Sequence, residues 1–184
     1  MMRYFKIILI FFLFLLNKTS FANENIVEIL KKKNNIIFIR HAIAPGNGDP
    51  PNFDILDCST QRNLSKKGEL QALKIGEFFK ENEIEFTKVL SSEWCRCKDT
   101  AKIAFGSYET KNFLNSFYDK RFSENKDKQI LGFQKFIKDW DFSGNLILVT
   151  HYVVISEILD LATSSGELVI TDNNLEILSS LEIN

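Results

Sequence analysis

The amino-acid sequence predicts an α/β protein with a mostly parallel sheet. Two short, unbroken apolar runs, residues 36–39 and 146–149, are typical of strands that are buried on both faces. Between them, apolar residues recur with helical spacing, as at Ile130, Phe133 and Ile137. Strands that alternate with helices favour a parallel sheet covered by helices. A length of 184 residues suits one domain of this kind.

Helices are expected where a capping residue precedes a run with helical periodicity. Ser65 can cap a helix that ends near residue 82. The apolar side chains of this helix that we expect to face the core are Leu70, Leu73, Phe78 and Phe79. Further helices are expected over residues 95–105, 129–140 and 153–161.

Short strands and one long loop account for most of the remaining chain. Strands are expected at residues 89–90 and 108–114, and a C-terminal hairpin is expected to pair residues 167–171 with residues 175–178. Residues 42–63 contain all three prolines and two of the eight glycines, which is typical of a loop. A loop of that length in a compact domain usually serves function.

The N-terminus has the three-part layout of a secretory signal peptide. Arg3 and Lys6 supply a positive start, and Ile7 to Leu16 is an unbroken run of ten apolar residues. The small residues Ser20 and Ala22 then stand at the −3 and −1 positions of a cleavage site. Ten residues fall short of the ~20 that span a bilayer, which favours a cleaved signal over the alternative, an uncleaved anchor.

Cleavage would leave residues 1–22 as the signal peptide and residues 23–184 as one domain, secreted or periplasmic and without a stable membrane span. The first 22 residues carry three cations and no anion, so the mature chain has 20 Lys and Arg against 24 Asp and Glu, a net charge of −4. A nucleic acid is therefore not an expected partner, because its binding needs a basic surface. No feature of the sequence indicates an oligomeric state.

Three cysteines lie in the part expected to be exported: Cys58, Cys95 and Cys97. An oxidising compartment permits a disulfide, and the odd count leaves at least one thiol free or paired outside the chain. Cys95 and Cys97 are too close in sequence for an ordinary bridge to each other. A bridge from Cys58 to one of them is one expectation, and three buried thiols are the other.

Both histidines of the chain, His41 and His151, directly follow a predicted buried strand. In open α/β sheets, sites lie beyond the carboxyl ends of the strands, so we expect the two imidazoles to share a site. Arg40 precedes His41, and Arg96 opens a helix just past another strand end. The planar fork of arginine matches phosphate oxygens, and fixed cations stabilise a transferring phosphoryl group. These residues predict phosphate chemistry with a histidine nucleophile.

Four segments of the chain resemble the histidine phosphatase superfamily, also called phosphoglycerate-mutase-like. They are Phe38-Ile39-Arg40-His41-Ala42, Leu64 to Ala72, Ser91 to Ala101 with the pattern Ser-Ser-x-x-x-Arg-x-x-x-Thr-Ala, and Leu148-Val149-Thr150-His151. Each segment is weak by itself, but together they occur in family order over residues 36–155.

The resemblance implies a three-layer α/β/α sandwich and an exported phosphomonoesterase. His41 would be the nucleophile that becomes phosphorylated, and Arg40, Arg96 and His151 would hold the phosphoryl oxygens. No metal and no cofactor is implied. A non-catalytic domain of the same fold that binds a phosphorylated ligand is the alternative. Mutase activity is disfavoured, since the glycolytic substrates are cytosolic.

The resemblance fails at the general acid. Many members supply this group from a Leu-x-Glu segment, where this chain has Leu114-Asn115-Ser116. Asp119 is the nearest acid on the same predicted loop, and Glu93 and Glu167 are the other candidates. If no carboxylate protonates the leaving group, the substrate would carry an acidic leaving group or be a phosphoramidate.

Arg62, at the end of the long loop, is either a further phosphate ligand or a surface residue. Its segment, residues 60–65, and Ser165-Gly166-Glu167 resemble exported phosphatases linked to lipopolysaccharide-core heptose phosphate. This subgroup implies a small phosphorylated substrate such as a sugar phosphate. A different class of protein, in which His41, His151 and one cysteine bind zinc, would leave the arginines without a role.

Overall fold

The computed structural model describes residues 26–184. The predicted signal peptide, residues 1–22, and its cleavage site lie outside the described residues. Residues 26–31 are helical and pack Ile26 and Leu30 against the core before the first strand. Within the described part of the chain, no helix has the length and apolar character needed to cross a membrane.

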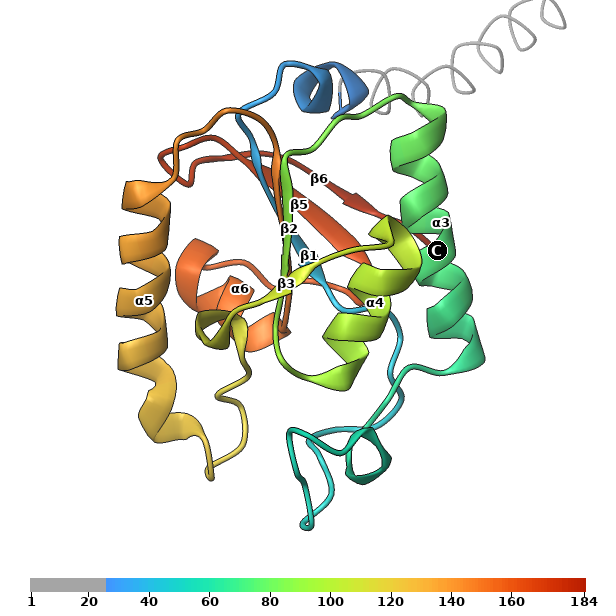
Figure 1. Ribbon diagram of the computed structural model, residues 1–184, viewed down its shortest axis with the longest axis vertical. Coiled ribbons are helices and arrows are strands. Elements are labelled where there is room, and N and C mark those ends of the chain that lie inside the picture. The colour runs from blue at the N-terminus through green and yellow to red at the C-terminus, as the bar shows by residue number, and fades with distance from the viewer. Residues whose placement is uncertain (1–25) are drawn as a thin grey trace, which may run out of the picture.

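A six-stranded sheet forms the centre of the fold (Figure 1). Along the sheet the strands run in the order β3 (Glu109–Thr110), β2 (Lys88–Ser91), β4 (Leu146–Thr150), β1 (Ile36–Arg40), β5 (Glu167–Thr171) and β6 (Ile177–Glu182). The first four strands are parallel to one another, whereas β5 pairs antiparallel with both β1 and β6. The predicted sheet, mostly parallel with a C-terminal hairpin, is confirmed.

Helices cover both faces of this sheet, as Figure 1 shows. One face carries α3 (Lys66–Glu81) and α4 (Cys95–Phe105), and the other carries α5 (Lys126–Asp139) and α6 (Tyr152–Leu159). Successive strand residues point to opposite faces, so Ile37 packs with α3 and α4, and Phe38 packs with α5 and α6. Three 3-10 turns lie in the connections, at Cys58–Thr60, Asn112–Leu114 and Ser123–Asn125. The implied three-layer α/β/α architecture is confirmed.

The buried face of α3 differs from the prediction. Phe78 and Phe79 pack in the core as expected, but Leu70 and Leu73 are 60% and 46% exposed, so their predicted place in the core is wrong. The buried residues of this helix are Gly68, Gln71, Ala72, Ile75 and Phe79. The phase of the helix explains the difference, because these buried positions recur every three or four residues, whereas Leu70 and Leu73 fall between them and lie on the opposite side. Close packing of α3 on α4 also requires glycine at position 76, because a Cβ there would lie 2.4 Å from a backbone oxygen of α4.

The strand expected over residues 108–114 is much shorter. Only Glu109–Thr110 pairs with β2 before the chain turns into the 3-10 helix Asn112–Leu114. That turn buries the consecutive side chains of Phe113 and Leu114 in the same core cluster as α5. In a strand, these two neighbouring side chains would point to opposite faces of the sheet. The strand therefore ends before them, because both side chains are buried on the same side.

The predicted long loop joins β1 to α3. Hydrogen bonds hold the last residues of the loop close to the end of β1. The Ser65 hydroxyl caps α3 by accepting the Gly68 N–H at 3.1 Å, and the Ser65 N–H donates to the Ile43 carbonyl at 3.0 Å. A Cβ on Gly68 would lie 2.1 Å from the same carbonyl oxygen, so this position requires glycine. The start of α3 is thereby held against the segment that follows His41.

Candidate active site

The two histidines lie side by side at the carboxyl ends of the central strands. β1 and β4 are parallel neighbours with Arg40 opposite Thr150, so the next residues, His41 and His151, emerge at the same edge of the sheet. The His41 N–H donates to the Thr150 carbonyl at 2.9 Å, and the two ring centroids are 5.5 Å apart. Both side chains are buried. The structure therefore brings the two histidines together, as predicted.

His41 offers one ring nitrogen to the site. Its Nδ1 lies 2.8 Å from the carbonyl oxygen of Ala42, so this nitrogen carries the proton and donates it to a hydrogen bond. Nε2 then holds a lone pair, which is the form that a nucleophile requires. Burial lowers the pKa of His41 well below its ordinary value, and the charge of Arg96 lowers it further. The ring is therefore neutral near pH 7.

The hydroxyl of Thr100 connects two of the sequence segments next to this histidine. It accepts the Ala42 N–H at 3.0 Å and donates to the Arg96 carbonyl at 2.7 Å. The residue after His41 is thereby tied to the first turn of α4. The Arg-x-x-x-Thr spacing has a physical basis here, because it places the hydroxyl one helical turn after the arginine and over its carbonyl.

His151 is oriented by a chain of polar side chains. Its Nε2 lies 2.9 Å from Ser92 Oγ, whose hydroxyl donates to Asn115 Oδ1 at 3.1 Å. Its Nδ1 lies 3.4 Å from Arg96 Nη2, and because arginine only donates, Nδ1 accepts and Nε2 carries the proton. Burial lowers the pKa of His151 well below its ordinary value, followed by the charges of Arg96 and His41. Neither Ser92 nor Asn115 was predicted as a site residue, although Ser92 stands in the Ser-Ser pattern that resembles the family.

Three arginines line the same cavity as the two histidines: Arg40, Arg62 and Arg96. Arg40 donates to the carbonyl of Thr163. Arg62, of which the sequence left open whether it is a surface residue, lines the cavity and donates to two carbonyls of the long loop. The Nε atoms of Arg40 and Arg96 are buried and have no hydrogen-bond partner among the described residues. Buried charged donors of this kind favour an anionic ligand.

Asp49, on the long loop, is a site residue that the sequence analysis missed. Its carboxylate pairs with Arg96 at 2.8 Å and accepts hydrogen bonds from Trp94 Nε1 and the Arg62 N–H, each at 3.0 Å. Burial alone would raise the pKa of Asp49, but the hydrogen bond and charge of Arg96, with these other donors, bring it below its ordinary value. The pair spans 47 residues and follows no periodicity. Its one sequence signal is an acid inside a loop rich in Gly and Pro.

Of the three carboxylates considered as proton donors, Asp119 lines the cavity. Arg121 donates to it from Nη2 at 2.8 Å and from Nε at 3.1 Å. These hydrogen bonds lower the pKa of Asp119 to about 2, so in this state it is an anion. Glu93 and Glu167 accept hydrogen bonds from nearby amide groups. The structure thus places Asp119 at the site with an arginine already bound to it.

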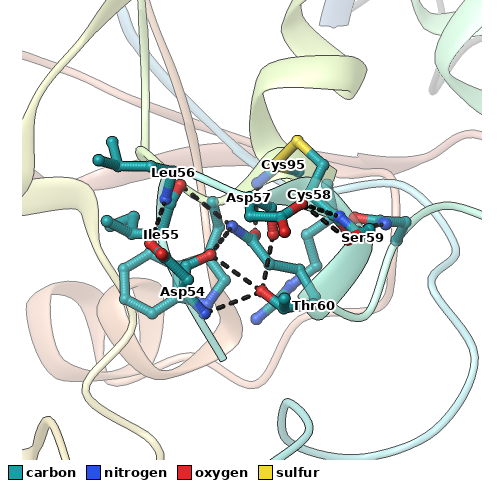
Figure 2. The surroundings of a disulfide bond; sticks show 12 residues. Asp54, Ile55, Leu56, Asp57, Cys58, Ser59, Thr60 and Cys95 are labelled. Atoms are coloured by element: carbon teal, nitrogen blue, oxygen red, sulfur yellow. Dashed lines mark hydrogen bonds between the residues drawn. A yellow bond between two sulfur atoms is a disulfide. The ribbon is translucent and has the colours of Figure 1, made fainter. Parts of the chain in front are cut away.

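A disulfide joins Cys58 of the long loop to Cys95, the first residue of α4 (Figure 2). Cys97 is a buried free thiol, 3.5 Å from His151 Nε2. Burial raises its pKa to about 12, which keeps it protonated and opposes metal binding. Residues 26–184 hold no group of three or more His, Cys, Asp or Glu side chains placed to bind a metal ion.

Comparisons with known proteins agree with this fold. The sequence profile of the histidine phosphatase superfamily (branch 1) matches residues 36–126. The structure of the protein histidine phosphatase SixA complexed with tungstate is similar, with a TM-score of 0.54 and 13% identity over 80% of this chain and 96% of that chain. Phosphoglycerate mutase from Thermus thermophilus has a TM-score of 0.54 and 16% identity over 82% of this chain and 99% of that chain. No curated protein sequence matches the chain.

At these identities the two structures establish the fold, and the sequence profile establishes the family. The matched residues include the segments around His41 and Arg96 from which the resemblance was drawn. The segment around His151 follows the matched range, and β4 places it beside His41. The chain is therefore an enzyme of the histidine phosphatase superfamily.

Proposed function

We propose that the protein is a phosphomonoesterase that works through a phosphohistidine on His41. The tautomer of His41 carries this proposal. The carbonyl of Ala42 holds the Nδ1 proton, which leaves the Nε2 lone pair available in a cavity that Arg40, Arg96 and His151 also line. A neutral imidazole beside fixed cations is suited to attack a phosphorus atom whose oxygens those cations hold.

Two displacements at phosphorus complete the reaction. Nε2 of His41 attacks phosphorus, the bond to the leaving oxygen breaks, and that oxygen takes a proton. Water then attacks the same phosphorus, the phosphorus–nitrogen bond breaks, and inorganic phosphate and neutral His41 are formed. Charge on the three equatorial oxygens is stabilised by Arg40 and Arg96, whose buried Nε groups are unpaired among the described residues. A bound phosphoryl anion favours protonation of His151 at Nδ1, and the protonated ring then donates a third hydrogen bond to the phosphoryl oxygens.

Asp119 is the proposed proton donor for the leaving group, because it lines the cavity. In the free enzyme its carboxylate is bound by Arg121, so donation requires this ion pair to open and the carboxyl group to take up a proton. A phosphoramidate or an acidic leaving group needs no such donor. The identity of the leaving group therefore decides whether Asp119 takes part.

A small sugar phosphate, such as a phosphate of the lipopolysaccharide core, is the proposed substrate, and the periplasm or exterior is the proposed location. The resemblance of residues 60–65 and 165–167 supports the substrate. The cavity volume of about 180 Å³ is below the ~300 Å³ of the smaller drug-binding pockets, so it suits a phosphoryl group with a small portion of its alcohol. The Cys58–Cys95 disulfide supports an oxidising compartment.

A panel of phosphoesters, including sugar phosphates and an aryl phosphate, tests the activity. The purified domain should release inorganic phosphate at the same rate with and without a metal chelator. Loss of activity with the chelator would contradict the mechanism. Binding of phosphate or tungstate without hydrolysis of any ester would instead favour a non-catalytic domain that binds a phosphorylated ligand.

A further inference from the structure

The guanidinium of Arg96 is held along one of its two edges by Asp49. Arg96 Nη1 lies 2.8 Å from Asp49 Oδ1, and Nη2 lies 3.2 Å from Oδ2. A guanidinium can bind an oxyanion end-on through both Nη atoms or side-on through Nε and one Nη. Asp49 occupies the end-on edge, so the side-on edge is left for another anion.

The side-on edge of Arg96 belongs to the cavity that contains the histidines. Its Nε is buried without a hydrogen-bond partner among the described residues, and its Nη2 lies 3.4 Å from His151 Nδ1. Arg40 is arranged in the same way, with Nη1 on the carbonyl of Thr163 and a buried, unpartnered Nε. Each arginine is thus fixed at one end by the protein and keeps a buried Nε–H group that has no partner among the described residues.

The carboxylate of Asp49 is itself held rigidly, so it can hold another group in place. Its side chain is 6% exposed, and besides Arg96 it accepts the indole N–H of Trp94 and the backbone N–H of Arg62. These donors come from the start of α4 and from the far end of the long loop. The loop, the helix and the guanidinium therefore meet at one carboxylate.

We propose that Asp49 is a positioning residue, which holds Arg96 so that its side-on edge meets two phosphoryl oxygens beside His41 and His151. This inference rests on the proposed function. Asp49 also sets the charge of the site. Arg121 neutralises Asp119, so the three cavity arginines and Asp49 leave two positive charges, which match the dianion of a phosphate monoester. A phosphate diester, with one negative charge, would be a poorer match.

The competing account is that Asp49 occupies the phosphate position and must be displaced. The two accounts predict opposite effects of Asp49→Asn, because the amide removes the charge and puts an N–H group against the guanidinium. A positioning residue is needed for anion binding, so its loss weakens the binding of tungstate, a tetrahedral oxyanion. A competitor opposes anion binding, so its loss strengthens it.

Two measurements test the inference: calorimetric titration gives the affinity for tungstate, and steady-state hydrolysis of an aryl phosphate gives kcat/KM. Asp49→Asn should weaken tungstate binding and lower kcat/KM, each by about tenfold or more, because small misplacements of a catalytic group are costly. Acetate or formate should restore part of the activity of Asp49→Ala by replacing the carboxylate. Asp54→Asn, an exposed aspartate of the same loop, should leave both measurements unchanged.

Several results would overturn the inference. Tighter tungstate binding by Asp49→Asn would assign the carboxylate as a competitor, and unchanged binding and kcat/KM would leave it no role. If Asp49→Asn does not fold, Asp49→Glu replaces it, since the charge is kept but moved by one methylene, and undiminished tungstate binding would contradict positioning. A wild-type protein that binds tungstate but hydrolyses no ester would contradict the proposed function alone. The role of Asp49 would still be decided by comparing tungstate binding of the wild type and Asp49→Asn. Absence of tungstate binding in the wild type would overturn both.

Discussion

Cys95 forms a disulfide with Cys58 and is the residue immediately before Arg96. The disulfide therefore links the long loop covalently to the residue that precedes the buried Arg96. Figure 2 shows that the loop around Cys58 is also closed by its own hydrogen bonds, including the Thr60 hydroxyl to the Asp57 carbonyl at 2.7 Å. Covalent and local restraints together fix the loop that carries Asp49 and Arg62.

Removal of this disulfide should destabilise the protein and weaken the site. The bridge closes a loop with a sequence separation of 37, for which a loss of about 2–4 kcal/mol in the free energy of unfolding is expected. Urea denaturation of the oxidised protein, the reduced protein and Cys58→Ser measures it. The reductant should have no further effect on Cys58→Ser. Equal stability and equal activity of the oxidised and reduced proteins would contradict a structural role for the bond.

The stability of the ligand-free protein should fall as the pH drops below about 6.5. Both histidines have folded pKa values well below the ordinary value, so below that value the unfolded chain binds more protons than the folded chain. Each histidine then lowers the free energy of unfolding by up to about 1.4 kcal/mol per pH unit, until its folded pKa is reached. Aspartates such as Asp49 act mainly below about pH 4.

Urea denaturation at pH 5.5 and pH 7.5 measures this pH dependence. The protein should be less stable at the lower pH, and His41→Asn should reduce the difference, because one of the two buried imidazoles has been removed. Equal stability at the two pH values would show that the folded protein accepts the protons, contrary to the buried and neutral state of both rings.

The sequence was sufficient for the parts of the fold that depend on local patterns. Continuous apolar runs located β1 and β4, and their ends located His41 and His151, because parallel neighbours end at the same edge of a sheet. The buried face of α3 was predicted wrongly for Leu70 and Leu73. These two leucines do not share the helical phase of the buried residues Ala72, Ile75 and Phe79, and it is the packed sheet that decides which phase faces the core.

The parts of the site that depend on contacts between distant segments could not be predicted in the same way. Asp49 and Arg96 meet only because the long loop folds back over the start of α4. The pairing of Asp119 with Arg121 is local, but ion pairs between residues two apart in a loop follow no general rule. The disulfide was one of the predicted pairings, whereas the choice of Cys95 over Cys97 follows from helix geometry, since Cys97 points into the core.

Arg96→Ala should lower kcat/KM by about thirtyfold or more, which corresponds to a loss of about 2 kcal/mol or more of transition-state stabilisation. The variant also leaves Asp49 buried without its main partner, so thermal unfolding should accompany the kinetics. Arg96→Lys separates charge from geometry, because a point charge cannot hold Asp49 and two phosphoryl oxygens together. Wild-type kinetics in Arg96→Lys would argue against bidentate contact.

Asp119→Asn should slow the hydrolysis of a sugar phosphate more than that of an activated aryl phosphate, because an alkoxide needs a proton to leave and an aryl oxide does not. Comparison of kcat/KM on the two substrates is the measurement. Arg121→Ala is the matched control, since it frees the Asp119 carboxylate without removing it. Equal losses on both substrates would remove Asp119 from the role of proton donor and assign it to the structure of the loop.

The proposed mechanism depends on a phosphohistidine at His41, which rapid quench with a ³²P-labelled phosphoester detects. The label should appear on the protein within the first turnover, be lost in acid and survive in base, as a phosphorus–nitrogen bond does. His41→Ala should carry no label, while His151→Ala should mainly slow its appearance. Label that persists in His41→Ala, or steady hydrolysis by the wild type with no protein-bound label at any time, would contradict the mechanism.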